Sequence, residues 1–519
     1  MTPHHYVKTK LPAKKAFLLN EVPKFLLFMT MLVAVIYTVT LVFWFQVSNM
    51  YLFILLVIGQ VFSLWMALTF LYTIWDMNYK PWGDDTFSEP VDVFITVAGE
   101  PVEIVEETVI AALAMDYPNF NIYLLNDGYV RQKDNWQDIE RLAIQYGIGC
   151  ITRKIPGGAK AGNINNGLSL TTSPFVAIFD ADHVPHPDFL RKTMRHFADP
   201  KMGFVQSPQY YKNYKTNYIT RGAWDQQSLF FGAIKKGKNR LNSVTMCGTN
   251  MTIRRKPLED VGGMCATNIA EDFVTGLFIH QRGWKSAYVP EVLAEGLAPE
   301  DFLSYYKQQL RWARGSLEVL FKYNPLFMRG LSWAQRIQYL ASASYYLSGT
   351  VIFLNSIIPL FFFFTGAVPF VISTMALAIV FLPYIFLILY NLQLSTNFTY
   401  TFRALAFSMG SWFIHLTALK ELVLNRKTGF AITSKKAVQG NFVYLVIPHL
   451  IYIALTCIGI GFALVREGMT ASFATNASWV LLNAAIFYPF IKAALPQPEA
   501  QAEPAEIMTP YGIPEHTLQ

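Results

Sequence analysis

The sequence contains little charge and few cysteines. Of its 519 residues, 15% are charged and 53% are hydrophobic, which is too apolar for a soluble protein of this size. The four cysteines, Cys150, Cys247, Cys265 and Cys457, are scattered without a CxxC pair, which argues against a zinc site or a disulfide framework. No cleavable signal peptide is evident, because the first apolar run is too long and a second follows it at once. The composition therefore predicts a membrane protein in a reduced compartment.

Several uncharged runs are long enough to cross a bilayer. Residues 26–45 carry no charge, and twenty helical residues rise about 30 Å, roughly the thickness of the hydrocarbon layer. Residues 51–75, 442–465 and 473–491 are similar runs, and 337–402 contains two more, separated by a turn at 365–369. We expect six spans with one soluble block, residues 76–331, between the second and the third.

The positive charges next to the spans predict the orientation. Lysines 8, 10, 14 and 15 precede the first span, and Arg426, Lys427, Lys435 and Lys436 precede the fifth. Because such residues favour the cytoplasmic side, we expect the soluble block and both termini in the cytoplasm. The net charge of +7 fits anionic lipid nearby, so no nucleic acid partner is needed to explain it.

The remaining segments complete the expected organisation. We expect a cytoplasmic segment at 1–24, two spans at 25–75, a hairpin at 332–400, an amphipathic interfacial helix and a loop at 401–440, two spans at 441–495, and a tail at 496–519. The tail is rich in proline and glutamate with little apolar content, which predicts disorder.

The soluble block alternates between strand and helix patterns. Strands are expected at 91–97, 121–125, 149–153 and 175–179, and helices near 101–115, 135–146 and 161–170. Such alternation predicts a mostly parallel sheet covered by helices, with ligands bound at the carboxyl ends of the strands.

Acidic residues follow two of these strands. Asp127 closes one, although a lone Asp there is more often a turn former or a helix cap. Asp180 and Asp182 close another, and residues two apart on an extended segment project the same way. Both carboxylates can therefore face one hard cation and the diphosphate that it bridges.

Glu271 and Asp272 open an expected helix that reaches His280. Acids in a first turn are most often partners of the helix dipole or caps. The functional alternative is a carboxylate that takes a proton from a sugar hydroxyl as general base.

Gln308, Arg311 and Trp312 lie at i, i+3 and i+4 on one face of a helix that is expected to start at residues 299–301. A helical Trp is by default a core residue. A Trp that shares its face with Arg and Gln suits a sugar ring stacked beside a phosphate instead.

In this order, the motifs resemble those of the processive, membrane-integrated members of glycosyltransferase family 2, which include bacterial cellulose synthase catalytic subunits, hyaluronan synthases and chitin synthases. The sequences DADH at 180–183, MCGT at 246–249 and QSPQ at 206–209 are similar to the DADH, FCGS and QTP segments of the cellulose branch. FAITSK at 430–435 resembles the FxVTxK gating loop of that branch. Ala270 departs from the family's threonine, and from the short segment after the last span we expect no PilZ domain in this sequence.

The resemblance implies a fold and a role for each candidate residue. The fold would be an α/β glycosyltransferase domain of the GT-A type, inserted in a transmembrane helical bundle of about six spans. Asp272 with Glu271 would be catalytic, and Asp182 with His183 would hold Mg²⁺ or Mn²⁺. The nucleotide sugar would contact Asp127, Lys160, Asp180, Gln308 and Arg311, the acceptor would contact Trp312, Cys247 and Gly248, and the gating loop would use Phe430, Thr433 and Lys435.

The implied activity is processive, inverting polymerisation of a β-linked polysaccharide across the bacterial inner membrane. The favoured product is a β-glucan made from UDP-glucose, with the growing glycan as acceptor and room for a periplasmic or membrane accessory subunit. Other β-polymers stay open: β-1,3- or mixed-linkage glucan, an N-acetylglucosamine polymer or a mannan. A non-processive transferase acting on a lipid carrier and a transporter or binding scaffold with a decayed enzymatic block are further alternatives.

Overall fold

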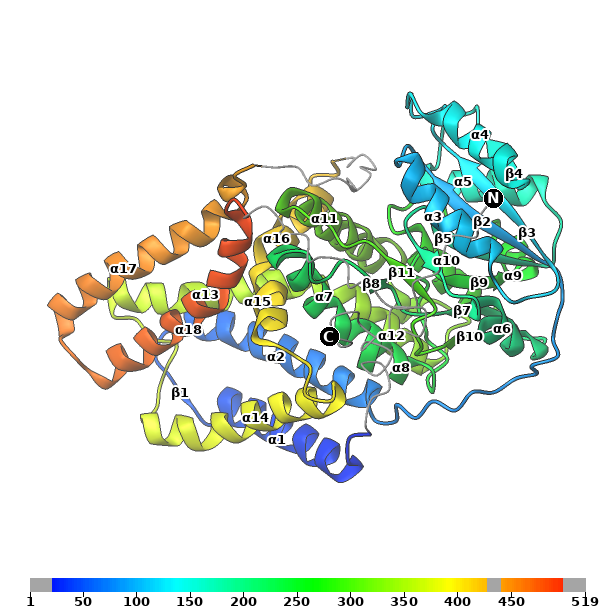
Figure 1. Cartoon of the computed structure of the whole chain (residues 1–519). Coiled ribbons are helices and arrows are strands. Elements are labelled where there is room, and N and C mark those ends of the chain that lie inside the picture. Colours follow the sequence, from blue (N-terminus) through cyan, green and yellow to red (C-terminus); the bar gives the residue numbers. More distant parts are fainter. Residues whose placement is uncertain (1–20, 427–439, 498–519) are drawn as a thin grey trace, which may run out of the picture.

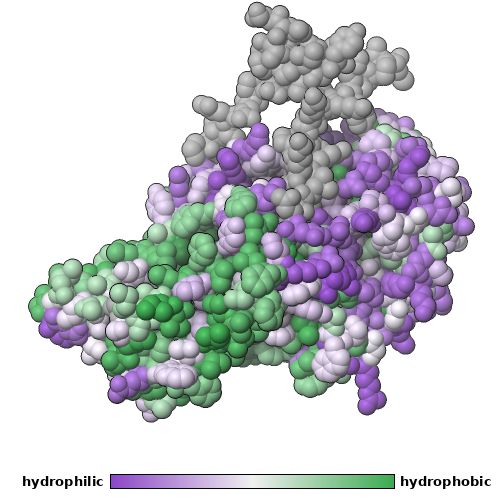
Figure 2. All heavy atoms as spheres, turned by 90° about the horizontal axis from the view of Figure 1, so that it is seen from below, coloured by the Kyte–Doolittle hydropathy of each residue, from purple (hydrophilic) through white to green (hydrophobic). Residues whose placement is uncertain are grey.

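The computed structural model describes residues 21–426 and 440–497. Within these ranges, six helical stretches are long and apolar enough to cross a membrane. They lie together at one end of the molecule (Figure 1), whose surface is mainly hydrophobic (Figure 2). They comprise α1 (Lys24–Phe43), α2 (Met50–Thr73), α12 (Trp333–Ser344) continuing through a short turn into α13 (Ser348–Thr365), α14 (Thr374–Ser395), α17 (Ile447–Glu467) and α18 (Ala471–Ala494).

The turn between α13 and α14 lies at the break expected from the sequence. α13 ends at Gly366, whose φ of +77° favours a residue without a side chain. The strand β12 (Phe370–Val371) follows and pairs antiparallel with β1 (Gln46–Val47), which lies between α1 and α2. These two loops therefore lie at the same end of the helical bundle.

A seven-stranded sheet forms the centre of the soluble block. Its order is β10-β7-β9-β5-β2-β3-β4. The strands are β2 (Val91–Val97), β3 (Phe120–Asn126), β4 (Gly149–Thr152), β5 (Phe175–Asp180), β7 (Met202–Gln206), β9 (Met251–Arg254) and β10 (Lys285–Tyr288). A smaller sheet of order β6-β11-β8 joins β6 (Val184–Pro185), β8 (Tyr210–Tyr211) and β11 (Ala294–Gly296) beside it.

Alternate side chains of β2 enter two different cores. Val93 and Ile95 pack in the cluster that contains Val105 of α3, whereas Phe94 packs in the cluster that contains Ile164 of α5. Every residue of β2 is buried, as expected for a strand covered by helices on both faces. The covering helices include α3 (Val102–Leu113), α4 (Trp136–Tyr146), α5 (Ala159–Leu170), α6 (Phe189–Met194) and α9 (Arg255–Val261).

One strand runs against the others. β9 pairs antiparallel with both β5 and β7, and its first residue, Met251, is the partner of Ile178 near the carboxyl end of β5. The segment that precedes β9 therefore reaches the sheet edge where the neighbouring strands end. The alternation of strands and helices in the sequence does not reveal this reversal.

The soluble block meets the bundle through further helices: α7 (Tyr218–Leu229), α8 (Lys235–Lys238), α10 (Glu271–Gln281), α11 (Phe302–Glu318), α15 (Phe402–Gly410) and α16 (Trp412–Val423). α11 packs on α16, and α7 packs on α15. Where one interfacial helix was expected at 402–424, the structure has two helices, α15 and α16, with a break at Ser411. His449 of α17 donates from Nε2 to the carbonyl of Gly410 at 2.8 Å, so the break provides an acceptor for a helix-packing hydrogen bond.

Candidate active site

One cleft at the carboxyl edge of the large sheet contains every candidate residue that the structure describes. Its lining includes all twelve of them: Asp127, Lys160, Asp180, Asp182, His183, Cys247, Gly248, Glu271, Asp272, Gln308, Arg311 and Trp312. Phe430, Thr433 and Lys435 of the expected gating loop lie outside the described residues, as do 1–20 and 498–519 of the expected terminal segments. Motifs spread over nearly 200 residues of sequence thus meet in one place.

Asp127, just beyond β3, forms a buried pair with an arginine that the motifs did not indicate. Arg153 donates from Nε to Oδ1 at 2.8 Å and from Nη2 to Oδ2 at 2.7 Å. A second arginine, Arg131, lies 3.8 Å from the same carboxylate. This two-pronged contact fixes the orientation of Asp127 at the edge of the cleft. Arg153 directly follows β4, and that strand-end position was the signal for it in the sequence.

We expect Arg153→Met to destabilise the soluble block strongly. The substitution removes the two-pronged partner of the buried Asp127 carboxylate and leaves only the more distant Arg131, and breaking a buried pair costs about 3–5 kcal/mol. The measurement is the apparent melting temperature of the purified protein, with Arg191→Met as control, because the Arg191–Asp116 pair is exposed and worth roughly 1 kcal/mol or less. Equal melting temperatures for the two variants would contradict the prediction, and adding Asp127→Asn to Arg153→Met should recover part of the loss.

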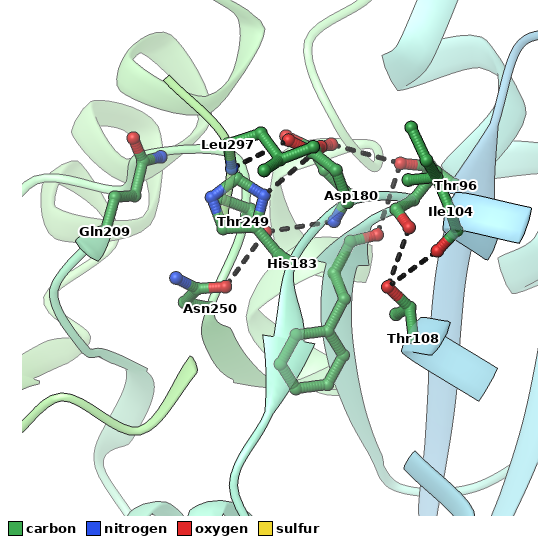
Figure 3. Close-up of polar contacts among 12 residues, drawn as sticks. Thr96, Ile104, Thr108, Asp180, His183, Gln209, Thr249, Asn250 and Leu297 are labelled. Carbon is green, nitrogen blue, oxygen red and sulfur yellow. Dashed lines mark hydrogen bonds and ion pairs between the residues drawn. The ribbon is translucent and has the colours of Figure 1, made fainter. Parts of the chain in front are cut away.

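Asp180 and Lys160 form an ion pair that spans the cleft. Lys160, on the first turn of α5, donates to Asp180 Oδ1 and, at 2.7 Å, to the carbonyl of Gly248. The backbone of Asp180 donates to Thr249 Oγ1 at 2.9 Å, and Thr96 Oγ1 donates to its carboxylate at 3.2 Å (Figure 3). Burial acts to raise the pKa of Asp180, but Lys160 and His183 together lower it, so the pair stays charged.

Asp182 and His183 form the candidate metal site. Asp182 Oδ2 accepts from the backbone of Leu297 at 3.1 Å, and His183 Nδ1 lies 3.4 Å from Asp182 Oδ1 (Figure 3). Both ring nitrogens of His183 are buried, and neither makes a hydrogen bond within the described part of the chain. An imidazole without hydrogen bonds beside a buried carboxylate fits a divalent cation.

The protein donors do not complete a metal site by themselves. Across residues 21–426 and 440–497, no three His, Cys, Asp or Glu side chains converge closely enough to hold an ion. Mg²⁺ in phosphate-transferring sites commonly has one or two carboxylate ligands and takes the rest from substrate phosphates and water. The donor set therefore fits a cation that is held jointly with a diphosphate.

Glu271 and Asp272 begin α10 with no side-chain cap from Ala270. Burial, reinforced by the neighbouring Asp272, raises the pKa of Glu271 to about 7. Burial also raises the pKa of Asp272, although Lys160 and Lys235 act to lower it. A carboxylate whose pKa is raised toward neutrality is a better proton acceptor in that range.

Gly248 leaves the approach to Asp272 open. Its φ of +76° favours glycine, and a Cβ at this position would lie 3.1 Å from Asp272 Oδ2. A side chain there would press directly on the carboxylate. The sequence motif at 246–249 therefore has a steric reason for its glycine.

Gln308, Arg311 and Trp312 line the cleft from α11, whose first turn is capped by Asp301, which accepts from Ser304 N at 2.8 Å. α11 lies close to the start of α10, because a Cβ at Gly315 would come within 2.6 Å of the Ala270 side chain. The short contact between Gly315 and Ala270 places the face of α11 against the two acids.

The structure adds residues that motif spacing did not identify. Gln209 donates from Nε2 to the carbonyl of Cys247 at 2.8 Å, and Gln206 Oε1 accepts from Cys247 N at 2.9 Å. Tyr211 and Thr96 also line the cleft. Gln206 and Gln209 belong to the segment QSPQ, so the motif was visible although its contact with the loop at 245–250 was not.

The chain matches two family descriptions in overlapping regions. Residues 89–315 match "Glycosyltransferase like family 2", and residues 259–492 match "Cellulose synthase". The chain is 31% identical over 457 residues to the UDP-forming cellulose synthase catalytic subunit of Pseudomonas fluorescens, covering 84% of this chain and 61% of that protein. It is 34% identical over 312 residues to the corresponding subunit of Xanthomonas axonopodis pv. citri, covering 58% of this chain and 41% of that protein. The chain thus spans about three fifths of the first of these relatives, and less of the second.

Among solved structures, a mannosyltransferase from Pyrobaculum calidifontis in complex with GDP-Man and Mn²⁺ has a similar fold. Its TM-score is 0.52 at 17% identity, covering 72% of this chain and 100% of that one. This likeness and the six apolar helices confirm the expected fold class, a GT-A domain inserted in a helical transmembrane bundle. The ordered motifs, the cleft that they form and the two family matches agree: residues 89–315 are similar to glycosyltransferase family 2, and residues 259–492 are similar to cellulose synthase.

Proposed function

We propose that this chain is a processive, inverting glycosyltransferase that makes a β-linked polysaccharide from a UDP-sugar and moves it across the bacterial inner membrane. The observation that carries the proposal is the convergence of Asp180, Asp182, Asp272 and Trp312 in one cleft, with Trp312 on α11, which packs on α12 and α16. UDP-glucose and a β-glucan are the favoured donor and product, because the relatives are named UDP-forming cellulose synthases.

The donor would bind at the strand ends. Asp127, held by Arg153, would contact the nucleotide, and Lys160, Gln308 and Arg311 would face the diphosphate. Asp182 and His183 would hold Mg²⁺ or Mn²⁺ together with the diphosphate oxygens. When bound, the cation would offset the negative charge that develops on the departing UDP.

The acceptor would bind beside α10 and α11. Trp312 would stack on the terminal sugar, and Cys247 and Gly248 would border it. Asp272 would take the proton of the attacking hydroxyl while its oxygen forms a bond to the anomeric carbon. The bond from that carbon to UDP breaks in the same step, the electron pair leaves with UDP, and the configuration inverts, so an α-linked donor yields a β-linked product.

The membrane helices would provide the exit. With residues 76–331 and both termini in the cytoplasm, product leaving the cleft would enter the bundle of six spans. Phe430, Thr433 and Lys435 are proposed from the family resemblance to cover the bound nucleotide and open for its release. A periplasmic or membrane accessory subunit would receive the polymer on the far side.

The proposal is tested with the purified full chain in lipid. UDP-glucose, UDP-N-acetylglucosamine and GDP-mannose are supplied separately with Mg²⁺, and any polymer is digested with linkage-specific glycosidases. We expect high-molecular-weight product from UDP-glucose that a β-1,4-glucanase degrades. Product cleaved by a β-1,3-glucanase, or formed from another donor, would keep the transferase and change the polymer. Transfer of single sugars to lipid would overturn processivity, and inactivity with every donor would overturn the proposal.

A further inference from the structure

A buried lysine lies behind the acceptor side of the cleft without a carboxylate partner. Lys235 begins α8, directly after a π-helical turn at Phe230–Ile234, and its side chain is fully buried at 0% exposure. Within residues 21–426 and 440–497, the hydrogen bonds of its ammonium go to Thr245 and not to a carboxylate. Burying an unpaired ammonium is costly, and π-helical turns occur frequently at functional sites. The position therefore needs an explanation beyond packing.

The ammonium of Lys235 is held by the segment that enters the cleft. It donates to the carbonyl of Thr245 and, at 2.5 Å, to Thr245 Oγ1. It also lies 5.0 Å from the centroid of the Phe230 ring, within the range of a cation–π contact. The side chain of Cys247 also interacts with Lys235 and acts to raise its pKa, so the polar contacts of Lys235 lead to two residues of one segment, Thr245 and Cys247.

Thr245 begins the stretch 245–250, which we call the acceptor loop. Cys247 and Gly248 of this loop line the cleft, and Gly248 O is held by Lys160 at 2.7 Å. Met246 packs on α10, since a Cβ at Gly276 would lie 3.1 Å from it. The acceptor loop therefore lies between the ammonium of Lys235 and the helix that carries Asp272.

The charges around Asp272 come from several elements. Five groups interact electrostatically with Asp272, so that one alters the pKa of the other. They are Lys160 on α5, Lys235 on α8, Cys247 on the acceptor loop, Glu271 on α10 and Tyr346 between α12 and α13. Lys160 is already engaged by Asp180. Lys235 is thus the buried cation near Asp272 that has no carboxylate partner in the described structure.

We propose that Lys235 is a positioning residue for glycosyl transfer: it anchors the acceptor loop through Thr245 and supplies a buried positive charge that favours the ionised form of Asp272. The inference rests on the proposed function, in which Asp272 is the base. Burial lowers the pKa of Lys235, while Cys247 and Asp272 act to raise it, and Lys235 in turn acts against the rise that burial causes in the pKa of Asp272.

The test compares Lys235→Met, Lys235→Arg and a matched control, Lys238→Met. Lys238 is 1% exposed on the same helix, but its Nζ donates to Ser342 Oγ of α12 at 2.7 Å rather than to the acceptor loop. Release of UDP from UDP-glucose is measured against pH with the full chain in lipid, and the affinity for UDP is measured separately by calorimetry.

Loss of the positive charge removes an influence that lowers the pKa of Asp272. The acidic limb of the pH–rate profile should therefore move to higher pH in Lys235→Met, with a rate loss of roughly tenfold near pH 6 that narrows at alkaline pH. Lys235→Arg should restore the wild-type limb, Lys238→Met should retain it, and the affinity for UDP should change by less than about twofold.

The inference would be overturned if the acidic limb of the pH–rate profile of Lys235→Met matched that of the wild type, or if Lys238→Met showed the same shift of that limb. A loss of UDP affinity as large as the loss of rate in Lys235→Met would also overturn it. Where Lys235→Met does not fold, Lys235→Gln keeps an N–H donor for Thr245 without the charge and carries the same expected shift. Asp272→Asn measured alongside separates the two proposals. Synthesis retained by Asp272→Asn defeats the proposed base, whereas an inactive Asp272→Asn with a wild-type limb in Lys235→Met defeats the role of Lys235 alone.

Discussion

Asp272→Asn is expected to lower polymer synthesis by roughly 10²- to 10⁴-fold, the usual contribution of a general base. The amide has nearly the shape of the carboxylate and can still accept from the backbone of Phe273, which lies 2.7 Å from Asp272 Oδ1. It cannot take a proton from the acceptor hydroxyl. The measurement is the rate of UDP release in lipid at saturating UDP-glucose, with UDP affinity determined by calorimetry.

Loss of rate without loss of nucleotide affinity identifies Asp272 with the chemical step. Asp116→Asn is the control, because Asp116 is exposed, pairs with Arg191 and does not line the cleft. Glu271→Gln provides a second comparison: since burial and Asp272 raise the pKa of Glu271 to about 7, its neutral form is already populated near neutral pH, and a smaller loss is expected. Full polymer synthesis by Asp272→Asn would contradict the assignment of the base.

The second large effect is expected for Asp182→Asn. Removing one charged ligand weakens the joint binding of cation and diphosphate, and a cation contributes several kcal/mol to stabilising the leaving group, so the rate should fall by roughly 10²-fold or more. In the wild-type chain, Mn²⁺ should increase the affinity for UDP. In Asp182→Asn that increase should disappear, while the affinity without a cation stays close to the wild-type value.

Calorimetric titration of UDP with and without Mn²⁺ measures this difference directly. Asp199→Asn is the control, since Asp199 pairs with Lys285 away from the cleft. A cation-dependent gain in UDP affinity that survives in Asp182→Asn would place the metal on other ligands. His183→Asn should give a smaller reduction of the gain, because an imidazole ring, unlike a carboxylate, brings no negative charge to the cation.

Much of the soluble block could be predicted because local pattern and tertiary environment agree there. β2 begins and ends at Val91 and Val97, the residues expected from the apolar run, since a strand covered on both faces is mostly apolar. Because the carboxyl ends of parallel strands meet at one edge of a sheet, Asp127, Asp180 and Asp182 could be predicted to lie close together. Helical spacing likewise predicted that Gln308, Arg311 and Trp312 share one side of α11. Each of these predictions depended only on a local sequence pattern, either the end of one strand or the face of one helix.

The features that escaped prediction depend on contacts between distant segments. The strand direction of β9 is set by its partners β5 and β7, not by the four residues of the strand itself. Arg153 hydrogen-bonds to Asp127, which lies 26 residues earlier in the sequence. Lys235 hydrogen-bonds to Thr245, which lies ten residues later. The break at Ser411 likewise interrupts a pattern that is continuous in sequence.

The late position of β9 in the chain has a consequence for synthesis on the ribosome. β5 gains its neighbour on one side only when residues 251–254 have emerged, whereas β2 on the other side is made earlier. At roughly 5–20 residues per second, the edge of β5 that later pairs with β9 stays unpaired for at least several seconds. An unpaired apolar strand edge is open to association with other chains. By then α1 and α2 have already been translated, so this exposed edge is held next to the membrane from the moment it forms.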